Sequence, residues 1–256
     1  FLMYLMRLTD GRFYYTDEGI VPAAMASEVI PDFFRPPFHW YPQSDGAVFW
    51  LQIVLLGALV CLALGLGSRL AALVAYVLHL AFMQRNLSIV YGADIVSTFF
   101  LFSLIFIDSG RRLSVWPSKG KFGGLMSSAG WRLVQIQLCV IYGYTGLEKL
   151  KGPTWWEGTA VWSVLGNQQI MLVDLGWLKS FPLVVVGMTF STIVFEVYFP
   201  ALVWSKAVRK WLLLFGALLH AMIALTVGLV FFSGAMVATY FVFADESWFP
   251  RSWRRA

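Results

Sequence analysis

Charge is scarce in this sequence, since only 13% of its 256 residues are Asp, Glu, Lys or Arg while 59% are hydrophobic. A soluble domain usually carries about a quarter charged residues, and the mean hydropathy of +0.71 does not suit that class. The net charge of +5 does not describe a broad basic face, so we expect no nucleic-acid partner. The composition instead predicts an all-α, polytopic transmembrane helical bundle surrounded by membrane lipids.

Cysteine and the motifs of soluble enzymes are also rare or missing. Cys61 and Cys139 both lie in apolar stretches and form no CxxC, which favours packing roles over a disulfide or a metal site. There is no GxSxG, HExxH, P-loop or dinucleotide-binding fingerprint in a strand-turn-helix setting. The chain begins at Phe1 without a recognisable signal peptide, so we expect residues 1–8 to be the end of a truncated helix.

Apolar segments recur along the chain and predict about seven or eight membrane segments. They fall at 47–66, 70–84, 93–108, 131–149, 182–204, 211–227 and 229–245. Several are shorter than the ~20 residues that cross a bilayer. Ser233-Gly234 interrupts the last segment, so a re-entrant helix is an alternative to a span there. Because no internal repeat stands out, we expect 1–256 to form a single transmembrane domain.

Basic residues gather on one side of this predicted bundle. If the segments alternate, that side holds twelve of the 19 basic residues and only three acidic ones. The positive-inside rule makes it cytoplasmic, together with 109–131, 205–210 and the C-terminus, and places 10–46 and 151–180 outside. Prolines exclude a long helix in 10–46. The tryptophans of 151–180 indicate a segment lying along the outer interface.

Ionisable residues at membrane depth are few, and each needs a partner. Helical rise places them in two layers, an outer layer of Arg85, Asp94, Glu148 and Lys149 and a deeper layer of His79, Glu196 and His220. A lysine partly removed from water loses proton affinity and becomes a usable base, whereas a lysine that snorkels from a helix end needs no such role. Glu196 and His220 could form a proton relay or a hydrogen-bonded pair that fixes helix packing. His79 and His220 leave bis-histidine haem ligation open as a third interpretation.

Several short runs resemble the HTTM domain (horizontally transferred transmembrane domain), the membrane part of vitamin K-dependent γ-carboxylase. The resemblance covers about residues 10–245, and Lys-Leu followed by Trp-x-Gly-Thr-Ala is its most specific part. The runs are Gln135–Tyr142, Gly146–Leu150, Trp156–Ala160, Arg85-Asn86, Tyr91–Asp94, Leu219–Met222 and Phe231–Ser233.

The resemblance implies a reduced quinone, similar to vitamin K, as cofactor. In the carboxylase, a lysine of this motif deprotonates the quinol, oxygen attacks, and the resulting base removes a glutamate proton before CO2 adds. That lysine maps onto Lys149, with His220 and Asn86 as further catalytic residues. The residues expected to line or brace an outward-opening cofactor pocket are Arg85, Asp94, Glu148, Trp156 and Glu196.

This chain departs from the carboxylase at three points. Leu87 stands where the carboxylase has a histidine, and Glu148 stands where the animal enzyme has a lysine. No soluble carboxylase domain follows the membrane part within the 256 residues. The resemblance therefore predicts a bacterial inner-membrane protein with possible quinol-linked chemistry. The alternative is a non-catalytic subunit or maturation partner of another membrane or secreted protein.

Overall fold

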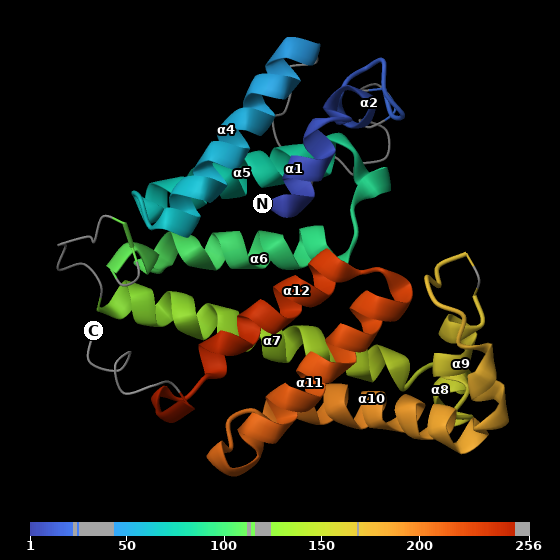
Figure 1. Cartoon of the computed structure of the whole chain (residues 1–256). Coiled ribbons are helices and arrows are strands. Elements are labelled where there is room, and N and C mark those ends of the chain that lie inside the picture. The colour runs from blue at the N-terminus through green and yellow to red at the C-terminus, as the bar shows by residue number, and fades with distance from the viewer. Residues whose placement is uncertain (23–24, 26–43, 112–113, 116–123, 168, 249–256) are drawn as a thin grey trace. The chain divides into compact units, whose positions relative to one another are not determined.

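The computed structural model describes residues 1–22, 25, 44–111, 114–115, 124–167 and 169–248, and every regular element among them is a helix. The all-α class predicted from the sequence is therefore confirmed. The chain divides into two compact units, Phe1–Arg132 and Leu133–Ala256 (Figure 1). The predicted single domain stays a prediction.

Unit 1 is built on three helices that pack in sequence order, with α4 against α5 and α5 against α6. Buried alanines on α5, among them Ala72 and Ala75, leave space for its neighbours to approach closely. Its elements are α1 (Leu2–Leu8), α2 (Gly11–Tyr15), α4 (Asp45–Leu64), α5 (Ser68–Arg85), the 3₁₀ helix η3 (Leu87–Ile89), α6 (Gly92–Phe106) and the 3₁₀ helix η4 (Ser109–Arg111).

The turn between α4 and α5 depends on a glycine. Gly65 ends α4 in the left-handed region at φ +74°, and its N–H donates to the carbonyl of Leu62. A Cβ at this position would lie 2.5 Å from Ser114 Oγ. Both the backbone angle and the contact therefore require glycine.

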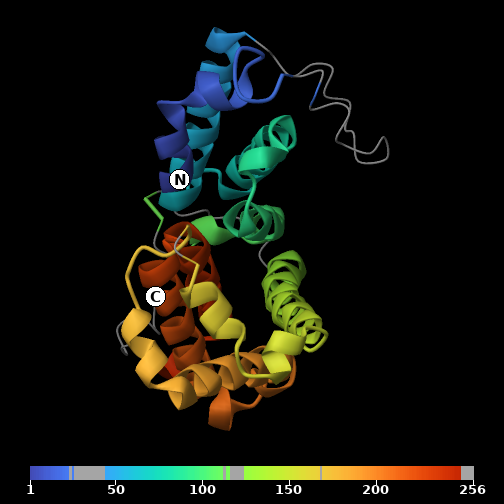
Figure 2. The same cartoon turned by 90° about the vertical axis from the view of Figure 1, so that its right-hand side faces the viewer.

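Unit 2 follows along α7 (Leu125–Lys149), which contains the boundary between the units. Figure 2 shows the short helices α8 and α9 beside the first part of α10, and α11 beside α12. The remaining elements are α8 (Pro153–Trp156), α9 (Ala160–Leu165), η5 (Gly176–Ser180), α10 (Pro182–Leu202), α11 (Lys206–Val227), α12 (Val230–Thr239), η6 (Tyr240–Phe243) and η7 (Glu246–Trp248). Pro182 begins α10 at a position where a missing N–H costs nothing, and Gly228 ends α11 at φ +77°.

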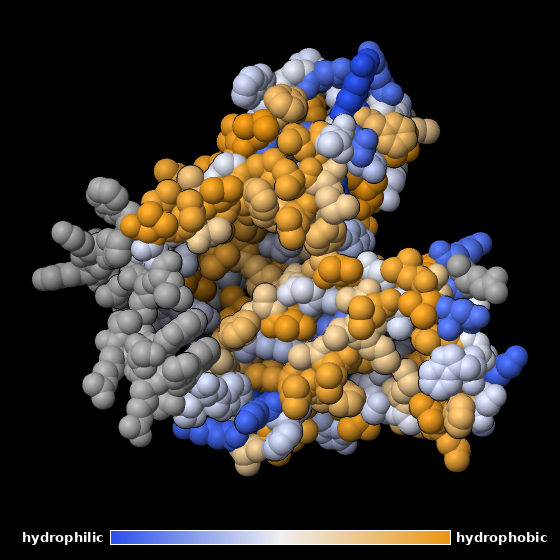
Figure 3. Space-filling view, viewed as in Figure 1, coloured by the Kyte–Doolittle hydropathy of each residue, from blue (hydrophilic) through white to orange (hydrophobic). Residues whose placement is uncertain are grey.

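Three helices are long and apolar enough to cross a membrane, namely α4, α10 and α11. Only 28% of the apolar window of α4 and 17% of that of α11 is buried within the protein. Much of the surface in Figure 3 is hydrophobic over the helices of both units. Apolar surface of this extent is costly in water and favourable in lipid, so the helices are compatible with an integral membrane protein.

The predicted helical segments coincide with observed helices, but the predicted number of spans is not established. Within the described residues, α6 and the α12–η6 pair are apolar but shorter than 18 residues. Ser233-Gly234 does not break the last segment, because α12 runs through it and tightens into 3₁₀ geometry only at Tyr240. The helices of 151–180 have six residues or fewer, so none of them spans a bilayer.

Several sequence predictions lie wholly or partly outside the described residues. These are most of the proline-rich part of 10–46, part of the basic segment 109–131, and the C-terminus from residue 249 onward. In the described part of 10–46, α2 has only five residues.

Candidate functional site

Lys149, at the C-terminal end of α7, forms an ion pair with Glu196 of α10. Its Nζ lies 2.7 Å from Glu196 Oε2, and the two side chains are 22% and 11% exposed. The same nitrogen lies 5.3 Å from the centre of the Trp155 ring, within the range of a cation–π contact. Lys149 is therefore held by a carboxylate and an aromatic face.

The partner of Lys149 comes from the deeper of the two predicted layers. Side chains on a helix point back toward its N-terminus, so a lysine at the end of α7 reaches toward the preceding turn, where Glu196 lies. A depth estimate based on Cα positions leaves out this reach. The predicted pairing of Glu196 with His220 is replaced by Lys149–Glu196.

Glu148 turns away from Lys149. Its Oε1 lies 2.6 Å from Lys151 Nζ on the exposed surface. The hydrogen bond and the charge of Glu148 raise the pKa of Lys151, which lies beyond the end of α7. Glu148 therefore pairs with Lys151, a residue that the sequence analysis did not name, and not with Lys149.

Trp156 is the exposed member of the tryptophan pair in α8. Its side chain is 61% exposed, and its Nε1–H donates to the carbonyl of Leu150 at 2.7 Å. Trp155, which the sequence analysis did not assign to the site, is the tryptophan that faces Lys149. Residue type could not separate the two, because adjacent residues of a helical turn point in different directions.

His220 of α11 belongs to a buried hydrogen-bonded chain with two tyrosines. Its Nε2 lies 2.7 Å from Tyr142 Oη, and Tyr142 Oη is also hydrogen-bonded to Tyr240 Oη. All three side chains are buried, with His220 only 3% exposed. Among the described residues, His220 Nδ1 has no hydrogen-bond partner. A buried imidazole nitrogen without a partner is costly unless something else satisfies it.

The Lys149–Glu196 ion pair and the hydrogen-bonded chain of His220, Tyr142 and Tyr240 (the His220 chain) lie near each other along α7 and α10. Tyr142 precedes Lys149 by seven residues, which is two helical turns or roughly 10 Å on the same face. On α10, Phe195 and Phe199 flank Glu196, and their ring centres lie 5.1 and 4.4 Å from that of Tyr142. The sequence analysis missed Tyr142, although its spacing from Lys149 was a usable signal. Nothing local in the sequence singled out Tyr240.

In unit 1, Asn86 and Arg85 hold the segment around α2. Asn86 is fully buried, donates from Nδ2 to the Tyr14 carbonyl at 2.8 Å, and accepts at Oδ1 from Ser88 N at 3.0 Å. Arg85 donates to the Val21 carbonyl at 2.7 Å and to Asp17 Oδ1 at 3.0 Å. Both side chains are used in holding the protein backbone in place.

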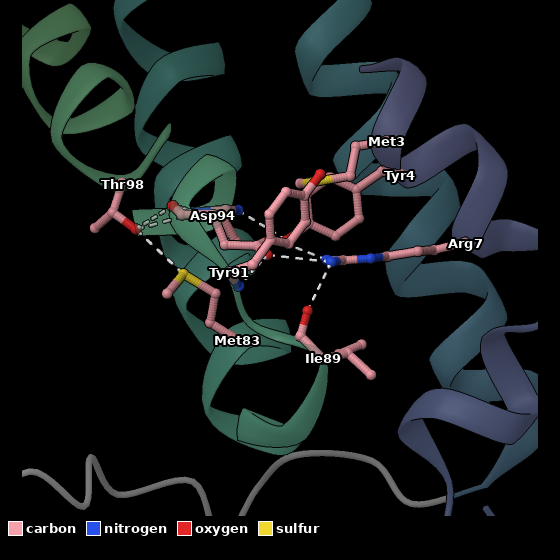
Figure 4. Close-up of polar contacts among 9 residues, drawn as sticks. Met3, Tyr4, Arg7, Met83, Ile89, Tyr91, Asp94 and Thr98 are labelled. Carbon is pink, nitrogen blue, oxygen red and sulfur yellow. Dashed lines mark hydrogen bonds and ion pairs between the residues drawn. The ribbon is translucent and has the colours of Figure 1, made fainter. Parts of the chain in front are cut away.

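Asp94, at the start of α6, is paired with Arg7 of α1 (Figure 4). Arg7 Nη1 and Nη2 lie 2.9 and 3.1 Å from the two carboxylate oxygens, and Tyr91 N donates to Oδ2 at 3.2 Å. Arg7 Nη2 also donates to the Ile89 carbonyl at 3.2 Å. Asp94 therefore joins α1 to the start of α6, whereas Arg85 bonds to Asp17.

Both ring nitrogens of His79 are occupied within unit 1. Tyr4 Oη lies 2.7 Å from Nδ1, while the Asp94 carbonyl and Thr98 Oγ1 lie 2.9 and 3.1 Å from Nε2. An iron ligand needs one nitrogen free of such bonds, so this geometry does not favour haem ligation by His79. Within the described residues, no group of three His, Cys, Asp or Glu side chains could hold a metal ion.

The eight predicted site residues therefore fall into two sets. Arg85, Asn86 and Asp94 belong to unit 1, whereas Glu148, Lys149, Trp156, Glu196 and His220 belong to unit 2. In unit 2, Lys149 and Glu196 are in direct contact, and α10 links them to the His220 chain. Their catalytic and cofactor-binding roles stay predictions.

The chain is similar to a Bacillus subtilis (strain 168) protein named "Uncharacterized protein YitO". The two are 25% identical over 191 residues, which is 70% of this chain and 62% of that protein. The matched part thus spans less than two thirds of the relative's length. No protein-family model and no solved structure matches the chain. Membership of the HTTM family stays a prediction.

Proposed function

We propose that this chain is a bacterial HTTM-type membrane protein that binds a reduced quinone, or another isoprenoid lipid with a hydroxyl head group, beside Lys149 in unit 2. The Lys149–Glu196 pair carries the proposal. It is mostly withdrawn from water and lies among apolar helices, where an ionised pair is expensive to maintain. Lys149 also belongs to the Lys-Leu and Trp-x-Gly-Thr-Ala pattern, which is the most specific part of the resemblance.

The pair can hold and move a proton. In its ionic form the ammonium of Lys149 donates to the carboxylate of Glu196 across 2.7 Å. Transfer of that proton to Glu196 leaves a neutral amine hydrogen-bonded to a carboxylic acid. The amine can then take a proton from a ligand hydroxyl. Lys149 is the proposed base, and Glu196 stores its first proton.

His220 also fits an oxygen-bearing ligand. Its Nδ1 is buried without a partner among the described residues, while Tyr142 occupies Nε2. A ligand oxygen would satisfy that nitrogen, and Tyr142 would fix the orientation of the ring. A bound quinol would supply the hydroxyl proton and a pair of reducing electrons. The unit 1 residues Asn86, Arg85 and Asp94 are not needed for this proposal, because their polar groups hold α1 and α2.

Lys149→Met tests the proposal, with Lys151→Met as the matched control. Lys151 lies two residues away and is 70% exposed, so its loss removes the same charge without touching the pair. Purified protein in nanodiscs containing menaquinol is assayed for quinol oxidation, with dissolved oxygen as the electron acceptor, and for prenylquinone retained after washing. We expect Lys149→Met to lose both signals and Lys151→Met to keep them. Equal behaviour of the two variants would remove Lys149 from the site.

A stoichiometric protein that co-purifies in mild detergent, with no retained quinone, would favour the non-catalytic alternative.

We further propose that seven helical segments cross the bacterial cytoplasmic membrane, with 10–46 and 151–180 outside. These segments are α4, α5, α6, α7, α10, α11 and α12 with η6. The supporting observation is the excess of basic residues in the segments assigned to the other side. Single cysteines at Asn167 and Lys206, in a chain with Cys61 and Cys139 replaced by serine, can be labelled in intact cells with a membrane-impermeant maleimide. We expect labelling at position 167 and none at 206, and the reverse pattern would invert the topology.

A further inference from the structure

Gly146 brings α10 unusually close to α7, one turn before Lys149. A Cβ at this position would lie 2.8 Å from Val197 N and 3.0 Å from the backbone carbon of Glu196. Both are main-chain atoms of a helix and cannot rotate away as a side chain would. Any larger residue at 146 must therefore push the two helices apart at Glu196 itself.

The size of that displacement can be compared with the reach of the ion pair. Ordinary van der Waals contact begins at 3.4 Å, so a methyl group that starts at 2.8 Å requires a separation of about 0.6 Å. The Lys149–Glu196 hydrogen bond is 2.7 Å long, near the short end for a charge-assisted bond, and weakens when lengthened by that amount.

The other half of the contact is set by Pro200, one turn after Glu196 in α10. Proline has no N–H to donate to the carbonyl four residues earlier, so α10 lacks one of its internal hydrogen bonds at Glu196. The Pro200 ring lies against Gly143, where a Cβ would be 3.1 Å from Cγ. Here the neighbour is a side-chain atom, so Gly143 tolerates a methyl group better than Gly146 does.

We propose that Gly146 is a positioning residue, whose missing side chain lets the Glu196 backbone approach α7 closely enough for its carboxylate to hold Lys149. This inference rests on the role proposed above for the Lys149–Glu196 pair. A larger residue at 146 would leave both ionisable groups in place and uncouple them.

A double-mutant cycle separates positioning from simple packing. Melting temperatures of Lys149→Met, Glu196→Gln and the double variant give the coupling between the two side chains. The cycle is then repeated with Gly146→Ala and, as controls, with Gly143→Ala and Gly187→Ala. Gly187 lies on α10, and a Cβ there would meet nothing within 4 Å, so its substitution tests the helix without the contact. We expect the coupling to vanish only with Gly146→Ala. Persistence of the full coupling in that background would overturn the proposal.

A second measurement works in membranes and does not require the variant to survive purification. An amino group that is held in an ion pair must leave its partner before its nitrogen can react with an acylating reagent, so an intact Lys149–Glu196 contact slows the reaction. Acylation of Lys149, quantified by mass spectrometry of its peptide, should be as fast in Gly146→Ala as in Glu196→Gln, and slow in the wild type and in Gly187→Ala. Wild-type rates in Gly146→Ala would refute the positioning role. Neither experiment uses a quinone, so a loss of coupling without any quinol turnover would reject the proposed function and leave the role of Gly146 standing.

Discussion

Replacing Asp94 with alanine should strongly destabilise unit 1. The carboxylate is fully buried and accepts three hydrogen bonds, two from Arg7 at 2.9 and 3.1 Å and one from Tyr91 N at 3.2 Å. Alanine leaves the Arg7 guanidinium, whose side chain is 13% exposed, without its counter-charge. Breaking a buried pair by removing one partner costs about 3–5 kcal/mol. At a few degrees per kcal/mol for a unit of this size, we expect the melting temperature to fall by about 10 °C or more.

The two free cysteines provide the assay. Cys61 lies in α4 of unit 1 and Cys139 in α7 within unit 2, and both are partly buried. A thiol-reactive dye applied to a Cys139→Ser background therefore reports on the opening of unit 1 as the temperature rises. The control is the double variant Arg7→Met/Asp94→Leu, which removes both charges and supplies apolar side chains.

We expect the double variant to melt closer to the wild type than Asp94→Ala does. The reason is that an apolar pair needs no counter-charge, whereas a single buried guanidinium does. An Asp94→Ala protein that melts with the wild type, or a double variant that melts below Asp94→Ala, would show that the pair does not hold α1 in place.

Three further substitutions test individual contacts with the same dye assay. Asn86→Ala removes both hydrogen bonds of a fully buried side chain and should destabilise unit 1 by about 2–3 kcal/mol, and an unchanged melting curve would mean that the α2 contact is dispensable. Gly65→Ala forces a side chain into φ +74° and against Ser114, so we expect a loss of at least about 1 kcal/mol; a neutral or stabilising effect would contradict that geometry. Tyr142→Phe leaves His220 Nε2 without its partner and should cost unit 2 about 1–3 kcal/mol, read from Cys139 in a Cys61→Ser background. An unchanged curve would place the hydroxyl outside the chain of hydrogen bonds.

Helix positions could be predicted from the sequence because lipid imposes a strong local signal. An apolar run must satisfy its own backbone hydrogen bonds, so the segments at 47–66 and 182–204 coincide with α4 and α10 to within a few residues. The number of spans is harder to predict. Lengths such as the 15 residues of α6 fall between a span and a buried helix, and composition does not separate the two.

Partners could not be predicted in the same way, because the most buried ion pairs join residues that lie far apart in the chain. Asp94 bonds to Arg7 across 87 positions, and Lys149 bonds to Glu196 across 47. The low polarity of a membrane indicates that such groups need partners, but only the packing of helices determines which partners they find. Arg7 received no role in the sequence analysis, because a lone arginine near the end of an apolar segment has the same pattern as a snorkelling residue.

The two ion pairs also differ in a way that bears on function. Asp94 is fully buried and receives three N–H groups, so its acceptor capacity is largely used and a ligand has little to gain there. Each carboxylate oxygen can accept more than one hydrogen bond, and the described contacts of Glu196 include one bond, from Lys149 to Oε2. Lys149 keeps 22% of its side chain exposed, and His220, which bonds to α7 two turns before Lys149, keeps Nδ1 without a partner among the described residues. Unused hydrogen-bonding capacity beside a buried charge is what a bound polar head group needs, which is why the proposed site lies at Lys149 and not at Asp94.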